Sequence, residues 1–248
     1  MESINFSPNN LNYITCERCF YLNQKLKIVF KGGFPQIFNT FDLIQKDYFL
    51  DKGTAGISKL LPEGKFFKTV TKKTRKERIK NSLPEFNDLE IPGNIKSIEL
   101  KDNKSRPFTL GGRPDLVVKF KNSFGVLDFK TTGKEDKTQK YKYQLEAYAQ
   151  IFENPNNETP TLTPITHLGL IQFTPSNIIK HDLKSCTQKI ETNYFPLERN
   201  NESKAEFLKF MTYLMDILEK NSIPNKSLSC GICNAADEYS KLYNFNES

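Results

Sequence analysis

Two aspartates and a lysine in the middle of the chain have the types and spacing needed to hold a divalent metal and activate water. Asp128 and Lys130 lie two residues apart in the apolar run 124–129, so on a strand both side chains project to one face. A hairpin predicted around residues 121–123 brings Asp115 beside them. Two carboxylates give Mg²⁺ or Mn²⁺ a partial set of oxygen ligands, and the lysine can orient or deprotonate a metal-bound water. An Asp-x-Lys pair alone also fits a structural ion pair at a sheet edge, but the preceding aspartate favours the metal site.

The cysteines form a second candidate centre. Four of the five stand in two Cys-x-x-Cys pairs, Cys16 with Cys19 and Cys230 with Cys233, separated by 211 residues. The sequence predicts no secretion signal, so disulfides are disfavoured. Two such pairs favour a four-thiolate centre, either zinc or an iron–sulfur cluster, which requires the ends of the chain to meet. Cys186 stands alone and is expected to be an ordinary strand or loop thiol.

A basic segment lies between these centres. Residues 65–80 hold eight lysines and arginines against the single acidic residue Glu77, in a chain with 36 Lys+Arg, 29 Asp+Glu and a net charge of +7. Such a run is either a solvated surface or an element that contacts the phosphates of nucleic acid. The candidate contacts are Lys72, Lys73, Arg75 and Lys76.

Length and composition limit the class of protein. The chain has 248 residues, of which 37% are hydrophobic and 26% charged, enough apolar material for one large domain with a core. No apolar run reaches the roughly 18 residues of a membrane-spanning helix. Residues 1–10 lack the apolar stretch of a secretory signal. We therefore expect a soluble, cytoplasmic protein without a membrane partner.

The elements that must position the two centres follow an α/β pattern. A helix beginning at Ser7-Pro8 and running to about Lys25 is expected to carry Cys16 and Cys19 on one face. Three regions are predicted: residues 1–35 with this helix, a core over 36–200 with a basic insertion at about 51–93, and residues 201–248 with a helix and the second cysteine pair. Further helices are predicted at 36–50, 139–152 and 203–220, and strands at 95–100, 116–120, 124–129, 166–174 and 186–195.

The sequence resembles the PD-(D/E)XK nuclease superfamily, and specifically its RecB-like branch. Pro114-Asp115 and Asp128-Phe129-Lys130 match the two halves of the signature, and Gln144-Leu145-Glu146-Ala147-Tyr148 looks like the Gln-x-x-x-Tyr element of that branch. The resemblance implies a restriction-endonuclease-like core, a central mixed sheet flanked by helices, with helical N- and C-terminal extensions. It also implies that Asp115, Asp128 and the main-chain carbonyl of Phe129 hold Mg²⁺ or Mn²⁺, that Lys130 is catalytic, and that Gln144 and Tyr148 steady the active site or the DNA backbone.

The cysteines extend this resemblance. Some RecB-like nucleases clasp a [4Fe–4S] cluster with cysteines before and after the core, and residues 11–22 look like their N-terminal start. The resemblance implies such a cluster for Cys16, Cys19, Cys230 and Cys233, with Zn²⁺ as the alternative. Those families commonly place one cysteine in front and three behind, whereas this chain has two and two.

A second departure concerns the nuclease metal. Relatives often carry a histidine in the helical region before the first strand, and residues 52–58 contain none. A third metal ligand must then come from elsewhere, with Glu99 and Asp51 as candidates, or from water.

The expected function is therefore a metal-dependent DNA nuclease, acting as an exonuclease on single-stranded DNA or on DNA with single-stranded ends. The resemblance extends to nucleases that work with a helicase or another repair or CRISPR-type partner. The alternative is a non-catalytic nucleic-acid-binding or assembly module that retains the fold. A small-molecule or redox protein built on the cysteine centre would leave the carboxylate–lysine group unexplained.

Overall fold

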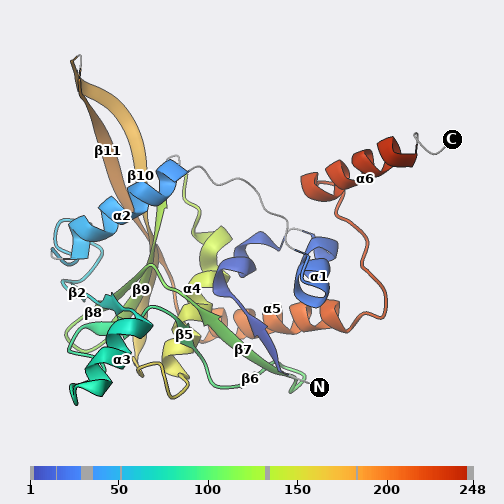
Figure 1. The fold of residues 1–248 in the computed structure, drawn as a ribbon, viewed down its shortest axis with the longest axis horizontal. Coiled ribbons are helices and arrows are strands. Elements are labelled where there is room, and N and C mark those ends of the chain that lie inside the picture. Colours follow the sequence, from blue (N-terminus) through green and yellow to red (C-terminus); the bar gives the residue numbers. More distant parts are fainter. Residues whose placement is uncertain are drawn as a thin grey trace.

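The computed structural model describes residues 3–14, 16–28, 36–50, 52–131, 135–182 and 184–244. A mixed five-stranded sheet forms its centre (Figure 1). β8 and β9 pair antiparallel as the predicted hairpin, β9 pairs parallel with β10, and β10 pairs antiparallel with β11. In spatial order the strands are β11 (Cys186–Leu197), β10 (Ile165–His181), β9 (Phe124–Thr131), β8 (Leu116–Lys119) and β2 (Lys65–Phe66).

Short strands form smaller sheets beside the central one, and most of them pair with β7 (Pro107–Gly112). β7 runs into the loop that carries Asp115, and β1 (Ile4–Phe6) pairs parallel with it. The first residues of the chain are thereby tied to the strand that leads into the carboxylate site. The remaining short strands are β5 (Ile95–Lys96) and β6 (Leu100–Lys101), which pair with β7, and β3 (Lys68–Val70) with β4 (Glu90–Pro92).

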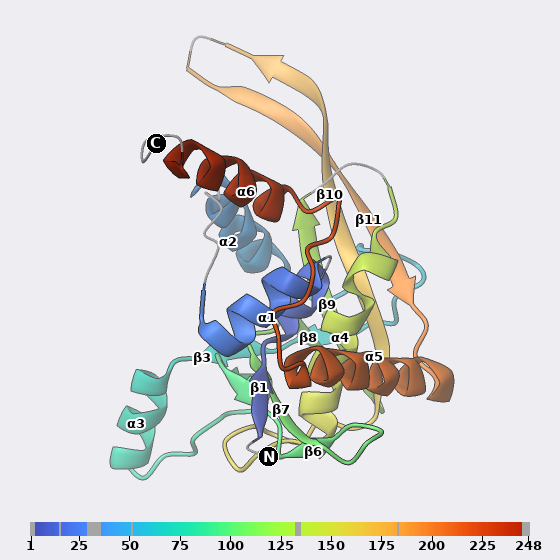
Figure 2. The same cartoon turned by 90° about the vertical axis from the view of Figure 1, so that its right-hand side faces the viewer.

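Helices cover both faces of the central sheet. The largest core cluster lies between the sheet and α4 (Thr138–Glu153), whose side chains Leu145, Ala147 and Ile151 are fully buried. α5 (Asn201–Glu219) packs behind α4, and α1 (Glu17–Leu26) lies against α5 (Figure 2). A second cluster on the opposite face includes Phe49 of α2 (Gln36–Leu50). The remaining helices are the 3₁₀ helix η1 (Pro8–Tyr13), α3 (Lys72–Lys80) and α6 (Gly231–Asn244).

The alternation of β9 decides where its polar residues point. Leu127 and Phe129 belong to the cluster on the α2 side, whereas Val126 belongs to the cluster on the α4 side. Because side chains alternate along a strand, Asp128 and Lys130 face α4. Asp128 is therefore a charged residue in a largely apolar layer, 3% exposed.

The N-terminal helix differs from its predicted form. The chain forms η1, then breaks before α1, and Cys16 becomes the N-cap residue of α1. Short 3₁₀ helices are common as connectors and next to the ends of α-helices. The predicted boundary at residue 35, like Asp51, lies outside the described residues.

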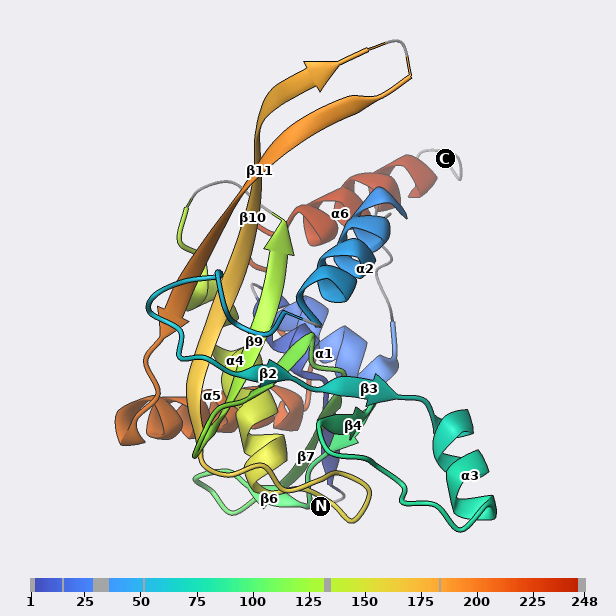
Figure 3. The ribbon, with the colours of Figure 1, turned by 90° about the vertical axis from the view of Figure 1, so that its left-hand side faces the viewer.

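Other regions contain elements whose bounds the sequence did not predict. The basic insertion forms β2, β3, α3 and β4, with α3 at the periphery (Figure 3). The C-terminal tail forms the helix α6. The apolar stripe of α2 faces outward, with Ile37, Ile44 and Tyr48 more than half exposed. The β10–β11 hairpin is longer than predicted and projects beyond the body (Figures 1 and 3).

Candidate active site and cysteine centre

The register of the β8–β9 hairpin brings the two aspartates together. The last paired residues are Leu116 and Leu127, so continuing the antiparallel register by one step places Asp115 opposite Asp128. The two carboxyl groups lie close enough that each shifts the pKa of the other. The hairpin predicted from the sequence therefore builds the carboxylate pair as expected.

Two lysines compensate the charge of this pair. The Lys130 ammonium forms an ion pair with Asp128 Oδ2 and lies 4.6 Å from the centre of the Tyr141 ring. Lys46 of α2 reaches the site from the other side, with its Nζ 2.9 Å from Asp115 Oδ1 and 2.8 Å from Asp42 Oδ2. Sequence reasoning missed Lys46, because Asp42 and Lys46 stand at i and i+4 and resemble an ordinary surface pair on a helix.

The pKa values of the two aspartates move in opposite directions. Burial and the neighbouring charge of Asp115 raise the pKa of Asp128 to about 8. Burial would also raise the pKa of Asp115, but the charges of Lys46 and Lys130 outweigh it and lower that pKa. The pair therefore holds a proton on Asp128 near neutral pH when no metal competes for it.

Gln144 and Tyr148 come from one face of α4, as their i and i+4 spacing requires. Gln144 Nε2 donates a hydrogen bond to Asp128 Oδ1 at 3.1 Å, and the Tyr148 hydroxyl donates to the carbonyl of Arg113 at 2.8 Å. Both side chains are buried, and Arg113 is two residues before Asp115. The helix thus fixes the two arms of the carboxylate pair, one through Asp128 and one through the backbone before Asp115.

The donor set fits a hard divalent cation. Two carboxylates face each other, and the buried Asp128 Oδ2 accepts no hydrogen bond of normal geometry beside its Lys130 ion pair. Pairing with β8 ends at Leu127, so the Phe129 backbone borders the site on a stretch that β8 no longer covers. Asp115, Asp128 and the Phe129 carbonyl are the groups that could hold Mg²⁺ or Mn²⁺.

Glu99 does not join these groups. It is exposed, and the N–H of its neighbour Ile98 donates to the carbonyl of Asn154, just past the end of α4. Asn154 follows Gln144 by ten residues, a distance of about 15 Å along a helix. The structure therefore does not bring Glu99 to the carboxylate pair, and the third ligand stays unassigned.

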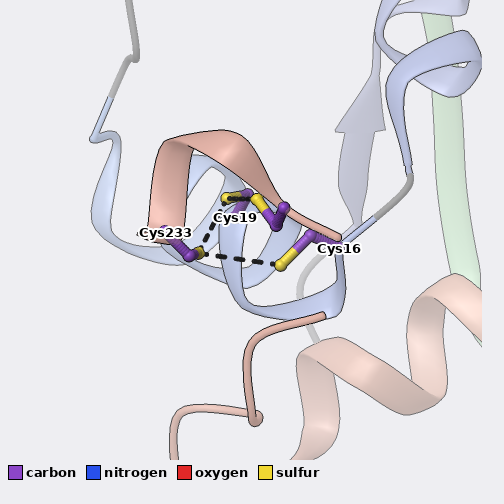
Figure 4. Close-up of side chains that lie close together, drawn as sticks. Cys16, Cys19 and Cys233 are labelled. Carbon is purple, nitrogen blue, oxygen red and sulfur yellow. Dashed lines mark hydrogen bonds between the residues drawn. The ribbon is translucent and has the colours of Figure 1, made fainter. Parts of the chain in front are cut away.

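The four cysteines meet in one cluster, joining α1 to α6. Figure 4 labels three of them, Cys16, Cys19 and Cys233. The closest sulfur pairs are Cys19–Cys233 at 3.3 Å, Cys19–Cys230 at 3.5 Å and Cys16–Cys233 at 3.8 Å, and all four Sγ atoms lie within 4.8 Å of one another. The prediction that the two ends of the chain share one centre is confirmed in geometry. Cys186 lies apart on β11 and is exposed.

The surroundings of the sulfurs fit a cation. Burial would raise the pKa of Cys16, but hydrogen bonds, first from the backbone of Ser227 and Cys19 and then from the other thiols, lower it to about 7. The Ser227 N–H lies 3.4 Å from Cys16 Sγ. Burial raises the pKa of Cys19 and Cys233. The protons that burial holds on these two closely packed sulfurs are ones that a metal would displace.

Part of the positive charge of the basic helix α3 is neutralised by ion pairs within the chain. Arg75 forms an ion pair with Glu85 and stacks over the Phe86 ring at 4.8 Å. Lys73 Nζ lies 4.0 Å from Glu77 Oε1, and both side chains are exposed, so this ion pair is weak. Of the four predicted nucleic-acid contacts, Arg75 is thus held in place by its own chain. Lys72 lines a groove of about 470 Å³, together with Lys96 and Arg113.

One comparison with known proteins identifies a family. The model of the PD-(D/E)XK nuclease superfamily matches residues 50–237. A solved structure described as "Crystal structure of SSO0001" aligns with 90% of this chain and 80% of its own, at 11% identity and a TM-score of 0.42. No curated protein sequence matches the chain. Among the described residues, no helix has the length and apolar character needed to cross a membrane.

Proposed function

The chain belongs to the PD-(D/E)XK nuclease superfamily, and from that premise we propose that it is a Mg²⁺- or Mn²⁺-dependent nuclease that hydrolyses phosphodiester bonds in DNA. The observation that carries the proposal is the carboxylate pair of Asp115 and Asp128 with Lys130 beside it. Each carboxyl group already has a lysine partner, but ion pairing alone gives no reason to set the two carboxyl groups opposite each other. A cation that both carboxylates bind accounts for that placement.

The residues of the chain have separate roles in this proposal. A bound divalent ion would neutralise phosphate charge and supply a water of lowered pKa. Asp115, Asp128 and the Phe129 carbonyl hold it. Lys130, whose pKa is raised because the aspartate charges outweigh its burial, stays protonated and can stabilise negative charge on the phosphate.

The groove beside the site supports a nucleic-acid substrate. Lys72, Lys96 and Arg113 line it together, and Arg113 leads directly into Asp115. Cationic side chains along a groove bordered by Arg113, two residues before Asp115, suit the phosphate backbone of a nucleic acid. We therefore place the path of the DNA along this groove, with a single-stranded end as the substrate that fits an exonuclease.

For the cysteine cluster we propose a single zinc ion with a structural role. The Zn–S distance of about 2.3 Å sets sulfur–sulfur edges of about 3.8 Å in a tetrahedron, close to the 3.3–3.8 Å of the nearest pairs. In a four-iron cluster each thiolate binds a different iron, so the cluster stands between the sulfurs and keeps them farther apart. The sulfur spacing thus favours one ion over the [4Fe–4S] cluster that the RecB-like resemblance implies.

The metal content decides this point. Protein purified without oxygen is expected to be colourless and to contain about one zinc per chain by elemental analysis. A brown protein with iron and acid-labile sulfide would overturn the zinc assignment and restore the iron–sulfur cluster.

The nuclease proposal is tested with labelled DNA that is single-stranded, double-stranded, or double-stranded with single-stranded ends. Cleavage is expected with Mg²⁺ or Mn²⁺, to stop with a chelator, and to be lost in Asp115→Ala. The matched control is Glu63→Ala, which removes an exposed carboxylate outside the site. Binding of DNA without cleavage under all of these conditions would instead identify a non-catalytic DNA-binding module.

A further inference from the structure

The side-chain amide of Gln144 is held on both sides by the N-terminal helix η1. Its Nε2 donates to Asn9 Oδ1 at 2.8 Å as well as to Asp128 Oδ1, and its Oε1 accepts from Asn12 Nδ2. Asn9 Oδ1 also lies 3.0 Å from the Tyr148 hydroxyl oxygen, whose single proton it shares with the Arg113 carbonyl. Two asparagines of one short helix therefore contact both residues that α4 directs at the carboxylate site.

The 3₁₀ form of η1 explains how both asparagines reach the same target. With three residues per turn, residues i and i+3 lie above one another, so Asn9 and Asn12 share one face and Asn10 does not. The close approach also needs Gly112 of β7. A Cβ on Gly112 would lie 2.9 Å from Pro8 Cδ and 3.2 Å from the Tyr148 hydroxyl oxygen.

The two contacts fix which end of the Gln144 amide faces Asp128. An amide has a donor end and an acceptor end. If it turned over, its oxygen would face the Asp128 carboxylate and its NH₂ group would face the NH₂ of Asn12. With Asn12 donating on one side and Asn9 accepting on the other, the Gln144 amide is held with its donor end toward Asp128.

We propose that Asn9 and Asn12 are positioning residues of the nuclease site, which lock the Gln144 amide so that it orients Asp128 for the divalent metal. The proposal rests on the proposed function for its link to cleavage, but its effect on metal affinity is independent of cleavage. Groups that orient a metal ligand typically change metal affinity by 10- to 100-fold when they are removed.

Both ends of η1 are anchored. Before it, β1 pairs with β7. After it, the chain reaches Cys16 in the cysteine cluster, only three residues past the end of the helix. The cluster therefore has a consequence for the nuclease site, because it holds the segment that orients Gln144.

The test measures Mn²⁺ affinity by electron paramagnetic resonance, without nucleic acid, in the full chain. Asn9→Ala and Asn12→Ala are expected to weaken Mn²⁺ binding by about tenfold. Asn10→Ala, an exposed asparagine of the same helix, is expected to match the wild type. Neither substitution is expected to weaken binding further in a Gln144→Ala background, since a residue that acts through Gln144 has no effect without it.

A pair of conservative substitutions keeps the test informative if an alanine variant fails to fold. Asn9→Asp retains an acceptor for Gln144 and is expected to keep Mn²⁺ affinity at or above that of the wild type. Asn12→Asp adds the same charge but replaces a donor with an acceptor facing Gln144 Oε1, and is expected to lose affinity. Equal effects of the two aspartates would mean that charge, and not amide orientation, governs the response.

The remaining outcomes separate this proposal from the proposed function. In cleavage assays, both alanine variants are expected to lower kcat and leave the KM for DNA unchanged. Unchanged Mn²⁺ affinity in both, or an added loss in the Gln144→Ala background, overturns the positioning role. A wild-type protein that binds Mn²⁺ with the expected variant pattern but cleaves no DNA upholds the positioning role and refutes the nuclease function.

Discussion

The cysteine cluster and the carboxylate site gather their cation-binding groups in different ways. The cluster has two equivalent halves, each at the start of a helix. Cys16 caps α1 and accepts a backbone hydrogen bond from Phe20, and Cys230 stands before α6 and accepts one from Asn234. Helix N-termini favour negative charge, so both halves suit thiolates once a metal has displaced the thiol protons. The cluster thus consists of four thiol groups, and a bound metal would compensate the negative charge of their thiolates.

The carboxylate site is assembled from unlike parts. Asp115 comes from a loop, Asp128 and Lys130 from β9, Lys46 from α2, and Gln144 from α4. Each of its two carboxyl groups already faces a lysine. The difference predicts that the cysteine centre needs its metal for the stability of the fold, whereas the carboxylate site needs its metal for chemistry and keeps its structure without it.

The largest expected effect is on activity. Asp128→Asn is expected to lower the cleavage rate by at least about 10²–10³-fold, because it removes a ligand charge from the site. The melting temperature of the metal-free protein should stay level or rise, since burial disfavours the charged form of Asp128. Steady-state cleavage and thermal unfolding check both statements, and a large loss of stability would contradict the contrast between the two centres.

The second effect is on stability. Cys230→Ser is expected to lose the bound metal and lower the melting temperature by roughly 10 °C, because the centre joins segments at opposite ends of the chain. Cys186→Ser is the matched control, an exposed cysteine outside the cluster, and should change neither. Elemental analysis and calorimetry measure the two outcomes. A Cys230→Ser protein as stable as the wild type would show that the cluster is not a structural centre.

Much of both centres could be predicted because their signals are local. Each Cys-x-x-Cys pair and the Asp-x-Lys strand can be recognised within a few residues, and the short hairpin places Asp115 opposite Asp128. The β8–β9 hairpin and the helix α4 also agree with the sequence prediction.

What could not be predicted depends on long-range packing. Lys46 becomes the partner of Asp115 only once α2 lies against the sheet, and Asn9 and Asn12 look like ordinary polar residues until η1 contacts α4. The apolar stripe of α2 shows the same limit. Periodicity identifies one face of a helix, but the face that packs here carries Phe49, while Ile44 and Tyr48 stay exposed.

The third effect is a pH dependence confined to the carboxylate site. The pKa of Asp128 is raised to about 8, above the value of about 3.9 in an unfolded chain. Between about pH 3.9 and about pH 8 the folded state therefore binds one proton more than the unfolded state. The stability that this proton contributes decreases as the pH rises through that range. Mg²⁺ must displace the proton, so Mg²⁺ should raise the melting temperature more at pH 8 than at pH 6.

Asp128→Asn supplies the control for this pH dependence, because it removes the titrating group. The difference between pH 6 and pH 8 in the Mg²⁺-induced shift should disappear in that variant. Asp115 does not oppose the trend, since its pKa is lowered and it titrates only at more acidic pH. A Mg²⁺ shift in the wild type that is equal at both pH values would contradict the proton on Asp128.

The smallest expected effect concerns the surface around each centre. Lys72, Lys73 and Lys76 lie on α3, and Lys72 lines the groove that Arg113 also borders. Replacing all three with Gln should flatten the salt dependence of duplex DNA binding by about 0.9 in slope for each phosphate interaction that is removed. Arg75 is left in place because its ion pair with Glu85 holds the end of the insertion.

The matched control lies on the helix that carries the first cysteine pair. Lys25 and Lys27, at the end of α1, make local contacts with Tyr21 and with the carbonyl of Gln24. Their replacement by Gln removes two similar charges far along the helix from Cys16, and should leave the salt slope unchanged. Fluorescence anisotropy over a range of salt concentrations measures both slopes. Equal slopes for the two variants would mean that the charge of α3 is an ordinary solvated surface. The carboxylate site would then differ from the cysteine cluster in its own residues and not in the charge of the surface beside it.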